Sequence, residues 1–364
     1  MTMFPVVEVS GGAFERGRIH GERARGRVEI SLANYARLFS FNGMAWEEAQ
    51  RRSEGYRDVI GSFDPDLVEE MEGIARGAGR PFSEILALNA RTEVLPPSFL
   101  TGADAGECTA IAVTPPASAT GETLLAQNWD WVGSQRGALI LLRVQEGAAP
   151  ACLTLTEAGM LAKIGVNSCG VGVCLNILRS VFDGAHAGVP VHVLLRALLK
   201  CTGVRDAVEF ASKLSFGGSS NILMADSGGD AASLEFSPKG LRVVRAEGAT
   251  LCHTNHFLHP EAVGWQAAHV ANLSTIPRLA RAREHAASRA KHSLEDVKRL
   301  LRDESAGLLS ICRKSDLSLP PEAQIESVAS VIMELARGVM HVAPDVPSRA
   351  EYQPVALAAE MAPA

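Results

Sequence analysis

The sequence predicts a layered α+β protein in which antiparallel sheets are covered by helices. Three observations lead to this fold class. The first hundred residues have the apolar spacing of amphipathic helices. From residue 108 onwards, short alternating runs that are typical of strands follow one another, separated by glycine or asparagine. Strands and helices therefore come in blocks, and not in the regular alternation that builds a doubly wound parallel sheet.

The N-terminal block predicts three helical stretches. Apolar spacing through 14–39, together with many Arg and Glu residues, indicates a long amphipathic helix. A second helix is predicted to begin at Pro65, because proline suits the first turn, and to run to about Gly77. A third is predicted over 83–92. The prolines and glycines that follow it predict an exposed loop of the kind that chain cleavage requires.

The second block predicts strands interrupted by two helical stretches. The helical stretches are 189–214 and the Arg- and His-rich segment 277–303. A glycine turn at Gly338 joins the last two strands into a hairpin. The predicted strands are 109–114, 123–129, 138–144, 151–156, 160–166, 171–177, 221–226, 232–236, 241–244, 250–254, 328–334 and 339–343.

Composition narrows the class of protein. The chain has 364 residues, 47% of them hydrophobic, which is enough for a large core in one domain or two. A net charge of -6 and a pI near 6.0, without a basic run, argue against nucleic-acid binding. No segment resembles a signal peptide or a membrane span. The seven scattered cysteines form no CxxC pair, which favours a reducing cytoplasm over a disulfide framework.

The dipeptide Glu107-Cys108 is the most informative candidate site. A loop of small and polar residues ends there, and a β-like run begins at the cysteine. If the chain is cut before Cys108, that residue carries both a thiol and an α-amine with a pKa of about 7.7–8.0. It then supplies nucleophile and base together, which is N-terminal-nucleophile catalysis. The alternative is a small buried hydrophobic residue at a strand start.

Four polar clusters stand in otherwise apolar, strand-like surroundings. Polar groups at strand ends in a large core must be paired, so each cluster is either a structural hydrogen-bond arrangement or part of a site. The clusters are 127–131 (Gln-Asn-Trp-Asp-Trp), 165–168 (Gly-Val-Asn-Ser), 253–256 (His-Thr-Asn-His) and 310–313 (Ser-Ile-Cys-Arg).

Together with these clusters, the stretch from Cys108 to Arg313 resembles the acyl-coenzyme A:6-aminopenicillanic acid (isopenicillin N) acyltransferase family. These are self-cleaving N-terminal-nucleophile enzymes, also classed as the C45 peptidases. The resemblance covers most of the chain in the same order, and the upstream segment 85–93 also fits. The further matching motifs are Cys108-Thr109, 156–159 (Thr-Glu-Ala-Gly), 188–190 (Gly-Val-Pro) and 234–238 (Leu-Glu-Phe-Ser-Pro).

The resemblance implies an αββα sandwich made from one precursor. Cys108 would attack the carbonyl of Glu107, and an acyl shift followed by hydrolysis would release a mostly helical α chain, 1–107, from a catalytic β chain, 108–364. The two chains would stay associated as one composite domain. Cys108 would then form a thioester with a small N-acyl amide or acyl-thioester substrate. Water as acceptor makes the protein an amidase, and an amine makes it a transferase. No cofactor is implied, with acyl-coenzyme A as a co-substrate for transfer.

Catalytic roles follow from the resemblance residue by residue. Asn255 corresponds to the oxyanion-hole donor, with a turn asparagine as the alternative. Asp130 corresponds to the carboxylate that holds the α-amine of Cys108, or else caps a strand end. Asn167 would add a second polar contact near that amine, or form a plain hairpin turn. Arg313 corresponds to a buried arginine that favours the thiolate and holds Asp130. The alternative is that Arg313 forms a structural salt bridge.

Two departures from the family bear on self-cleavage. The best-known member has Gly before the cysteine and Thr two residues after it, where this chain has Glu107 and Ala110. A larger, charged residue and a missing hydroxyl are expected to slow cleavage. They also leave open the alternative function, a precursor-like protein that never matures and serves as a scaffold or binding protein.

The resemblance also indicates where substrate would bind. Gln127 stands where related penicillin V acylases and bile-salt hydrolases carry arginine, which argues against that branch. Trp131 and Val132 stand where aromatic residues line the acyl pocket of the fungal enzyme, so the pocket should be apolar. The expected substrate-binding residues are Thr109, Gln127, Trp131 and Val132.

Two further patterns have less specific interpretations. His253, His256 and His259 have a spacing that invites a metal site, but no nearby Cys or Asp completes a ligand set, so we expect no metal. The basic stretch 278–285 is expected to be a solvated helix face, with contact to coenzyme A phosphates as the alternative.

Overall fold

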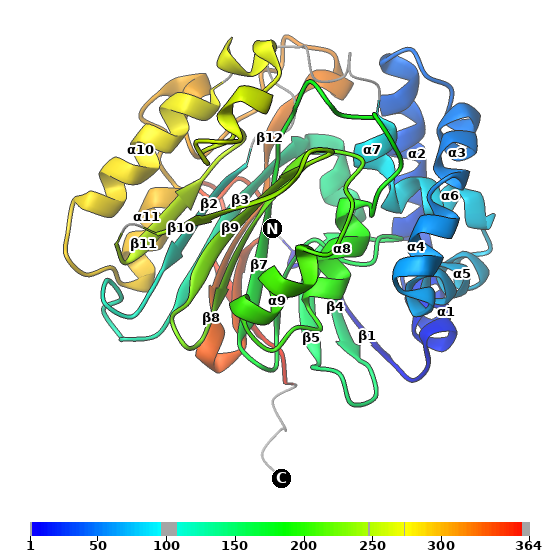
Figure 1. Ribbon diagram of the computed structural model, residues 1–364, viewed down its shortest axis with the longest axis horizontal. Coiled ribbons are helices and arrows are strands. Elements are labelled where there is room, and N and C mark those ends of the chain that lie inside the picture. Colours follow the sequence, from blue (N-terminus) through cyan, green and yellow to red (C-terminus); the bar gives the residue numbers. More distant parts are fainter. Residues whose placement is uncertain (1, 96–107, 247, 273, 359–364) are drawn as a thin grey trace.

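Two stacked β-sheets form the centre of the molecule, with helices on both outer sides (Figure 1). This computed structural model describes residues 2–95, 108–246, 248–272 and 274–358. The strands are β1 (Val6–Ser10), β2 (Thr109–Val113), β3 (Leu124–Val132), β4 (Leu139–Gln145), β5 (Cys152–Glu157), β6 (Ile164–Asn167), β7 (Val171–Ile177), β8 (Ser220–Asp226), β9 (Ala231–Ser237), β10 (Gly240–Arg245), β11 (Thr250–His253), β12 (Ile325–Glu334), β13 (Val339–Ala343) and β14 (Gln353–Ala356). The α-helices are α1 (Ala13–Arg23), α2 (Arg25–Phe41), α3 (Trp46–Glu54), α4 (Arg57–Phe63), α5 (Pro65–Ala78), α6 (Phe82–Asn89), α7 (Arg91–Val94), α8 (Val191–Leu198), α9 (Val204–Ala211), α10 (Thr275–Ala287) and α11 (Leu294–Leu301).

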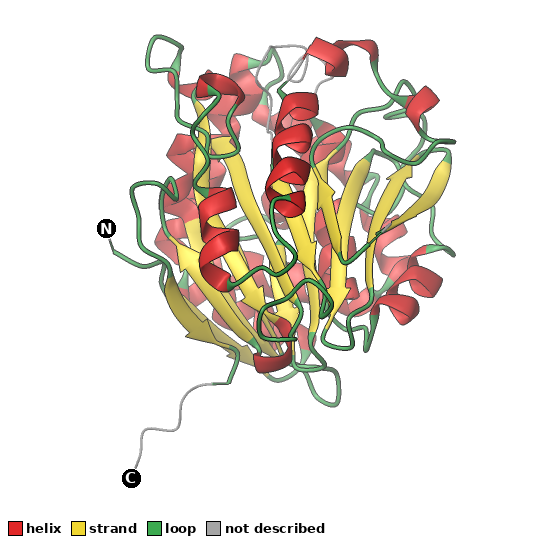
Figure 2. Ribbon diagram, turned by 90° about the vertical axis from the view of Figure 1, so that its left-hand side faces the viewer, coloured by secondary structure: helices red, strands yellow, loops and turns green. Residues whose placement is uncertain are grey.

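The strands form two sheets, named here sheet A and sheet B. Sheet A has the order β1-β4-β5-β6-β7-β8-β9-β10, and sheet B has the order β11-β2-β3-β12-β13-β14. Helices α10 and α11 cover sheet B, whereas α1–α7 lie on the opposite side of the molecule (Figure 1). Figure 2 shows the strands enclosed between helices. The predicted α+β fold class and the αββα sandwich are confirmed.

One pair of strands departs from the antiparallel arrangement of the rest of the two sheets. Strand β1 pairs with β4 in parallel, with a register from Val6↔Leu141 to Ser10↔Gln145. Antiparallel neighbours are commonly joined by a hairpin. β1 instead precedes the whole helical block and joins the sheet from a distant part of the chain. The direction of β1 is therefore not set by a tight turn. β1 was not predicted, because it is short and its pairing partner is far away in the sequence.

The predicted helix over 14–39 is two helices, α1 and α2, that meet at Ala24, where the backbone leaves the helical region (φ -105°). α1 packs tightly against α5 through glycine: a Cβ on Gly17 would lie 1.9 Å from the carbonyl oxygen of Glu70. The helix predicted from Pro65 is confirmed as α5, and it ends at Gly79 in the left-handed conformation (φ +68°).

Strand β3 lies at the centre of sheet B and positions the predicted cluster 127–131. All nine of its residues are buried, because sheet A covers one face and α11 packs on the other. Residues alternate between these faces. Each polar side chain of the strand is therefore enclosed, and must find its hydrogen-bond partner in the protein interior.

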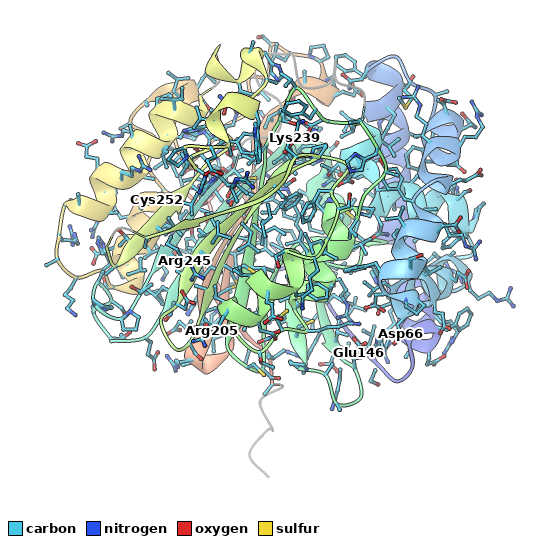
Figure 3. The ribbon with its side chains drawn as sticks, viewed as in Figure 1. Asp66, Glu146, Arg205, Lys239, Arg245 and Cys252 are labelled. Atoms are coloured by element: carbon cyan, nitrogen blue, oxygen red, sulfur yellow. The ribbon has the colours of Figure 1, made fainter. Side chains whose placement is uncertain are left out.

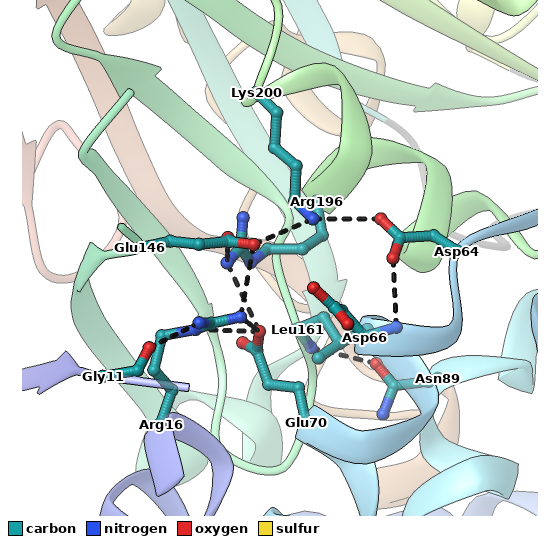
Figure 4. Close-up of polar contacts among 10 residues, drawn as sticks. All are labelled: Gly11, Arg16, Asp64, Asp66, Glu70, Asn89, Glu146, Leu161, Arg196 and Lys200. Carbon is teal, nitrogen blue, oxygen red and sulfur yellow. Dashed lines mark hydrogen bonds and ion pairs between the residues drawn. The ribbon is translucent and has the colours of Figure 1, made fainter. Parts of the chain in front are cut away.

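Residues before and after position 108 share one buried ion network (Figure 4). Glu70 of α5 accepts from Arg16 of α1 at 2.9 Å and from Arg196 of α8 at 3.3 Å. Arg196 also pairs with Glu146, which follows β4, at 2.5 Å. The main hydrophobic core likewise contains side chains from both segments. No helix in the described ranges is long and apolar enough to cross a membrane.

Candidate active site

Cys108 directly precedes β2 and is buried, with 4% of its surface exposed. Its backbone N–H donates to Asn255 Oδ1 at 2.8 Å. Its carbonyl oxygen accepts from Asn176 Nδ2 at 3.1 Å and from Arg278 Nη1 at 2.8 Å. Its Sγ lies 3.9 Å from the carbonyl oxygen of Asp130. The backbone and the thiol of this residue are thus held by groups from several distant parts of the chain.

Asn255 follows β11 and lies against the backbone of the nucleophile, as a site role requires. Its Oδ1 also accepts from Arg278 Nη2 at 3.0 Å, and its Nδ2 donates to the carbonyl of Ile177 at 3.0 Å. Both groups on Oδ1 are obligatory donors, which identifies the oxygen end of this amide as the one that faces Cys108. The backbone N–H donates to Thr275 Oγ1 at 2.7 Å.

Arg278 is a site residue that sequence reasoning missed. The expectation of a solvated helix face is wrong at this position, because Arg278 is fully buried. It shares the inner face of α10 with Leu279 and Ala282, and its Nε donates to Ser274 Oγ at 2.9 Å. The apolar spacing of α10 could have indicated this burial, since Arg278 lies on the same helix face as the apolar residues. The many exposed arginines around it concealed the signal.

Asp130 and Arg313 meet through a serine on β12. Asp130 Oδ1 accepts from Ser327 Oγ at 2.6 Å, and the same hydroxyl accepts from the backbone N–H of Arg313 at 3.0 Å. Arg313 is 3% exposed. The structure therefore brings these two predicted residues into one neighbourhood beside Cys108. Ser327, which connects them, had no sequence signal, because it stands in an otherwise ordinary strand pattern.

Asn167 lies at the end of β6 in sheet A, where its side chain serves the backbone. Its Nδ2 donates to the carbonyls of Leu199 and Cys201 at 3.0 and 2.7 Å. Its Oδ1 accepts from the N–H groups of Cys169 and Val171 at 3.0 and 2.9 Å. These contacts support the hairpin-turn alternative and correct the expected contact with the α-amine of Cys108.

Asn176 of β7 is a polar residue beside the nucleophile that was not among the predicted site residues. It contacts the carbonyl oxygen of Cys108, and its Oδ1 in turn accepts from Asn221 Nδ2 of β8 at 3.1 Å. The available sequence signal was a single polar residue in the buried run 171–177. Such a residue in an enclosed strand must have a polar partner.

Two of the predicted substrate-binding residues have structural partners. Thr109 Oγ1 accepts from Arg278 Nη1 at 2.8 Å. The Gln127 amide donates to the carbonyl of Leu175 at 2.6 Å and accepts from its N–H at 2.8 Å, which connects the two sheets. Both ends of this amide are bound to β7, and a side-chain hydrogen bond from Gln127 also lowers the pKa of Cys108, so Gln127 lies beside the nucleophile.

Trp131 and Val132, the other two, point to opposite faces of β3, because successive strand residues alternate. Trp131 lies under the guanidinium of Arg91, whose centre is 4.7 Å from a ring centroid. Trp129 shares this face, and the Lys163 ammonium lies 3.7 Å from its ring. Val132 is buried in the same hydrophobic core as the two tryptophans.

The electrostatic environment of the uncut chain keeps the Cys108 thiol protonated. Burial raises the pKa of Cys108 to about 11; the Asp130 carboxylate raises this pKa and the Lys163 ammonium lowers it. Lys163 is itself buried, and burial lowers its pKa to about 7. Lys163 was not among the predicted site residues, although a lone lysine within the apolar run 160–166 was a signal.

The histidines around Asn255 form hydrogen bonds that shape its loop. His253 Nε2 lies 2.8 Å from Glu235 Oε1, and Glu235 also accepts from the backbone N–H groups of Leu258 and His259. In the part of the chain that the structure describes, no three His, Cys, Asp or Glu side chains are placed to hold a metal ion. The predicted cleavage residue Glu107 lies outside the described residues.

Two stacked sheets covered by helices, with a buried cysteine directly before strand β2, define the class of protein as an αββα sandwich with a candidate cysteine nucleophile. The chain belongs to the acyl-coenzyme A:6-aminopenicillanic acid acyl-transferase family, whose model matches residues 118–341. The 40 kDa form of the acyltransferase of that name from Emericella nidulans is 31% identical over 313 residues, which cover 84% of each chain. Membership in this family indicates an enzyme of acyl transfer or amide hydrolysis.

Two solved structures are similar at lower sequence identity. A variant of the conjugated bile acid hydrolase from Clostridium perfringens has a TM-score of 0.47 at 12% identity, covering 70% of this chain and 100% of that one. Penicillin V acylase from Agrobacterium tumefaciens has a TM-score of 0.45 at 15% identity, covering 65% of this chain and 83% of that one.

Proposed function

We propose that this chain is an autoproteolytically activated amidohydrolase or acyltransferase that cleaves or forms an N-acyl amide bond through a thioester on Cys108. The observation that carries the proposal is the enclosure of Cys108, whose nitrogen, carbonyl oxygen and sulfur each contact a different group. A cut before Cys108 turns its N–H into an α-amine that is already next to Asn255. Nucleophile and base then belong to one residue in a buried, preorganised site.

Self-cleavage would begin with attack of the Cys108 sulfur on the carbonyl carbon of Glu107. A C–S bond forms as the C–N bond breaks, and the released nitrogen takes up a proton to become the α-amine. Water then hydrolyses this thioester and leaves a carboxylate on Glu107 and a free thiol on Cys108. The acyl shift consumes no cofactor, which fits an activation step that the chain performs alone.

Turnover would repeat this chemistry on a small molecule. The α-amine, with an ordinary pKa of about 7.7–8.0, takes the thiol proton and later gives it to the leaving amine. The Nδ2 of Asn255, which donates to the carbonyl of Ile177 in the uncut chain, is proposed as the donor to the tetrahedral oxyanion, a role that is typically worth about 3–4 kcal/mol. Arg278 holds Asn255 in place, and the Asp130 carboxylate is proposed to hold the α-amine.

The substrate class follows from the thioester. An N-acyl amide that acylates Cys108 gives hydrolysis with water and acyl transfer with an amine, and acyl-coenzyme A would serve as an alternative acyl donor. The name of the relative from Emericella nidulans describes an acyl-coenzyme A donor and a 6-aminopenicillanic acid acceptor for that protein. The ion network between Glu70 and Arg196 supports continued association of the two segments after cleavage.

Intact-mass spectrometry of the purified protein tests the proposal. We expect two species, residues 1–107 and 108–364, and a single species for Cys108→Ala. The matured protein is then incubated with a panel of N-acyl amides, with and without an acceptor amine, and the products are identified. An undivided chain with full turnover would contradict the proposal. An undivided, inactive chain would favour the scaffold alternative.

A further inference from the structure

A group of charged and aromatic side chains lies enclosed beside Cys108. Arg91 of α7 pairs with Glu157 of β5 at 3.2 Å, and the Tyr35 hydroxyl donates to the same carboxylate at 2.5 Å. Arg91 and Glu157 are 1% and 0% exposed. The two oxygens of Glu157 thus already have a cation and a hydroxyl as partners.

Lys163 adds a second cation to this group. Its Nζ lies 3.7 Å from a ring centroid of Trp129 and 5.6 Å from one of Trp131, and the residue is 3% exposed. Among the residues that the structure describes, no carboxylate forms an ion pair with Lys163. A buried ammonium is stabilised by aromatic faces, but it still lacks a compensating negative charge.

Cys108 lies on the side of the group where Lys163 is found. Thr109, the residue after Cys108, pairs with Asn128 of β3. The Sγ of Cys108 lies against the backbone carbonyl of Asp130 on the same strand. The sulfur is therefore placed along β3 next to the segment that carries the two tryptophans. The Lys163 ammonium lowers the pKa of Cys108, and the thiolate in turn raises the pKa of Lys163.

We propose that Lys163 is a positioning residue for the nucleophile, whose ammonium is the counter-ion of the Cys108 thiolate. The proposal rests on the proposed function in that Cys108 is the reacting group. It addresses the uncut chain, in which the Cys108 nitrogen is an amide and cannot act as a base. A thiolate also gives Lys163 a negative partner, since the Glu157 carboxylate already pairs with Arg91.

Other charged groups around Lys163 set the pH range in which this pairing operates. Arg91 lowers its pKa and Glu157 raises it, and His192 of α8 is neutral because burial holds its pKa well below the ordinary value. With a pKa of about 7, Lys163 is partly protonated at neutral pH, and formation of the thiolate favours its protonation.

The test compares Lys163→Met, which removes the charge, with Lys163→Arg, which keeps it. Lys163→Gln is a second neutral variant. Lys239→Met is the matched control, because Lys239 also lies over an aromatic ring, at 4.6 Å from Phe182, but is exposed in the turn after β9 (Figure 3). Circular dichroism and thermal unfolding establish that each variant is folded.

Two readouts follow each variant from pH 6 to 10. The first is the rate of self-cleavage. The second is alkylation of Cys108 by iodoacetamide, located by peptide mass spectrometry, with the exposed Cys169 as an internal reference. We expect both neutral variants to slow cleavage at least about tenfold and to raise the alkylation midpoint of Cys108 by about one pH unit or more. Lys163→Arg should restore both, and Lys239→Met should change neither.

The outcomes separate this inference from the proposed function. Neutral variants with unchanged cleavage and alkylation would overturn the counter-ion role. So would a folded Lys163→Arg that behaves like Lys163→Met, because side-chain shape and not charge would then matter. A wild-type chain that never cleaves, but whose Cys108 alkylation shifts in the neutral variants, would contradict self-cleavage and support the pairing of Lys163 with Cys108.

Discussion

The guanidinium of Arg278 lies 2.8 Å from the carbonyl oxygen of Cys108. Its second terminal nitrogen lies 3.0 Å from Asn255 Oδ1, which also accepts from the Cys108 N–H at 2.8 Å. The Asn255 amide therefore cannot rotate without breaking a hydrogen bond to a buried cation, and such bonds are stronger than neutral ones. One arginine thus orients the peptide of the nucleophile and the proposed oxyanion donor together.

We predict that Arg278→Gln slows self-cleavage by about a hundredfold, because the orientation of both Cys108 and Asn255 is lost. A time course of intact mass after purification measures the rate. Arg283→Gln, an exposed arginine on the same helix, is the control and should cleave at the wild-type rate. Normal cleavage in a folded Arg278→Gln would show that Arg278 does not position the site.

Cys108→Ala should remain a single chain without amidase or transferase activity, because sulfur is the proposed nucleophile in both reactions. Cys169→Ala removes a surface-exposed thiol and should leave both unchanged. Mass spectrometry and product analysis measure the two effects. Cleavage or turnover retained by Cys108→Ala would require a different nucleophile.

Asn255→Ala and Asn167→Ala should separate catalysis from stability. For Asn255→Ala in matured enzyme, kcat should fall by about 10²–10³ with little change in KM, as for loss of an oxyanion donor. Asn167→Ala leaves four backbone groups without its amide, so it should lower Tm while kcat stays close to wild type. A raised KM with unchanged kcat in Asn255→Ala would contradict the oxyanion role.

Acid should weaken the contact between the helical segment and the strands through His20. Its Nε2 accepts from the Gly159 N–H at 3.1 Å, and burial lowers the pKa of His20 to about 4 from 6.5. The unfolded chain binds this proton more tightly, so the stabilisation is complete above pH 6.5 and is lost as pH falls toward 4.

We therefore expect the free energy of unfolding to fall by on the order of 2 kcal/mol between pH 6.5 and pH 5 through His20 alone. Urea unfolding at the two pH values measures it. His20→Gln keeps an acceptor for the Gly159 N–H but does not titrate, so its stability should fall less with acid. Equal pH dependence in both proteins would exclude His20 as a source.

Gly17→Ala should destabilise the protein by about 3 kcal/mol, because the added Cβ meets the backbone of Glu70 and forces α1 away from α5. The matched control is Gly26→Ala in α2, where nothing lies within 4 Å of the added Cβ. That substitution should be neutral or stabilising by up to about 1 kcal/mol. Thermal unfolding compares the two; equal Tm values would argue against the close helix contact.

Local patterns predicted much of the fold. The alternating run 171–177 is β7 with the same bounds, and the glycine turn at Gly338 joins β12 and β13. The break at Ala24 was not predicted, since apolar spacing continues across it. β1 and β14 were also missed, because each is a short edge strand whose pairing partner determines it, and β14 contains Pro354.

By itself, the sequence determined the succession of helical and strand blocks, the family, and the place of Cys108 at a strand start, because periodicity and motif order are local properties. Only the tertiary structure decided which polar residues surround that cysteine. Asn176 and Arg278 reach it from another sheet and from a covering helix, while Asn167 is used by a turn. Hydrogen bonds between residues far apart in the chain depend on how the layers stack, and no local pattern contains that information.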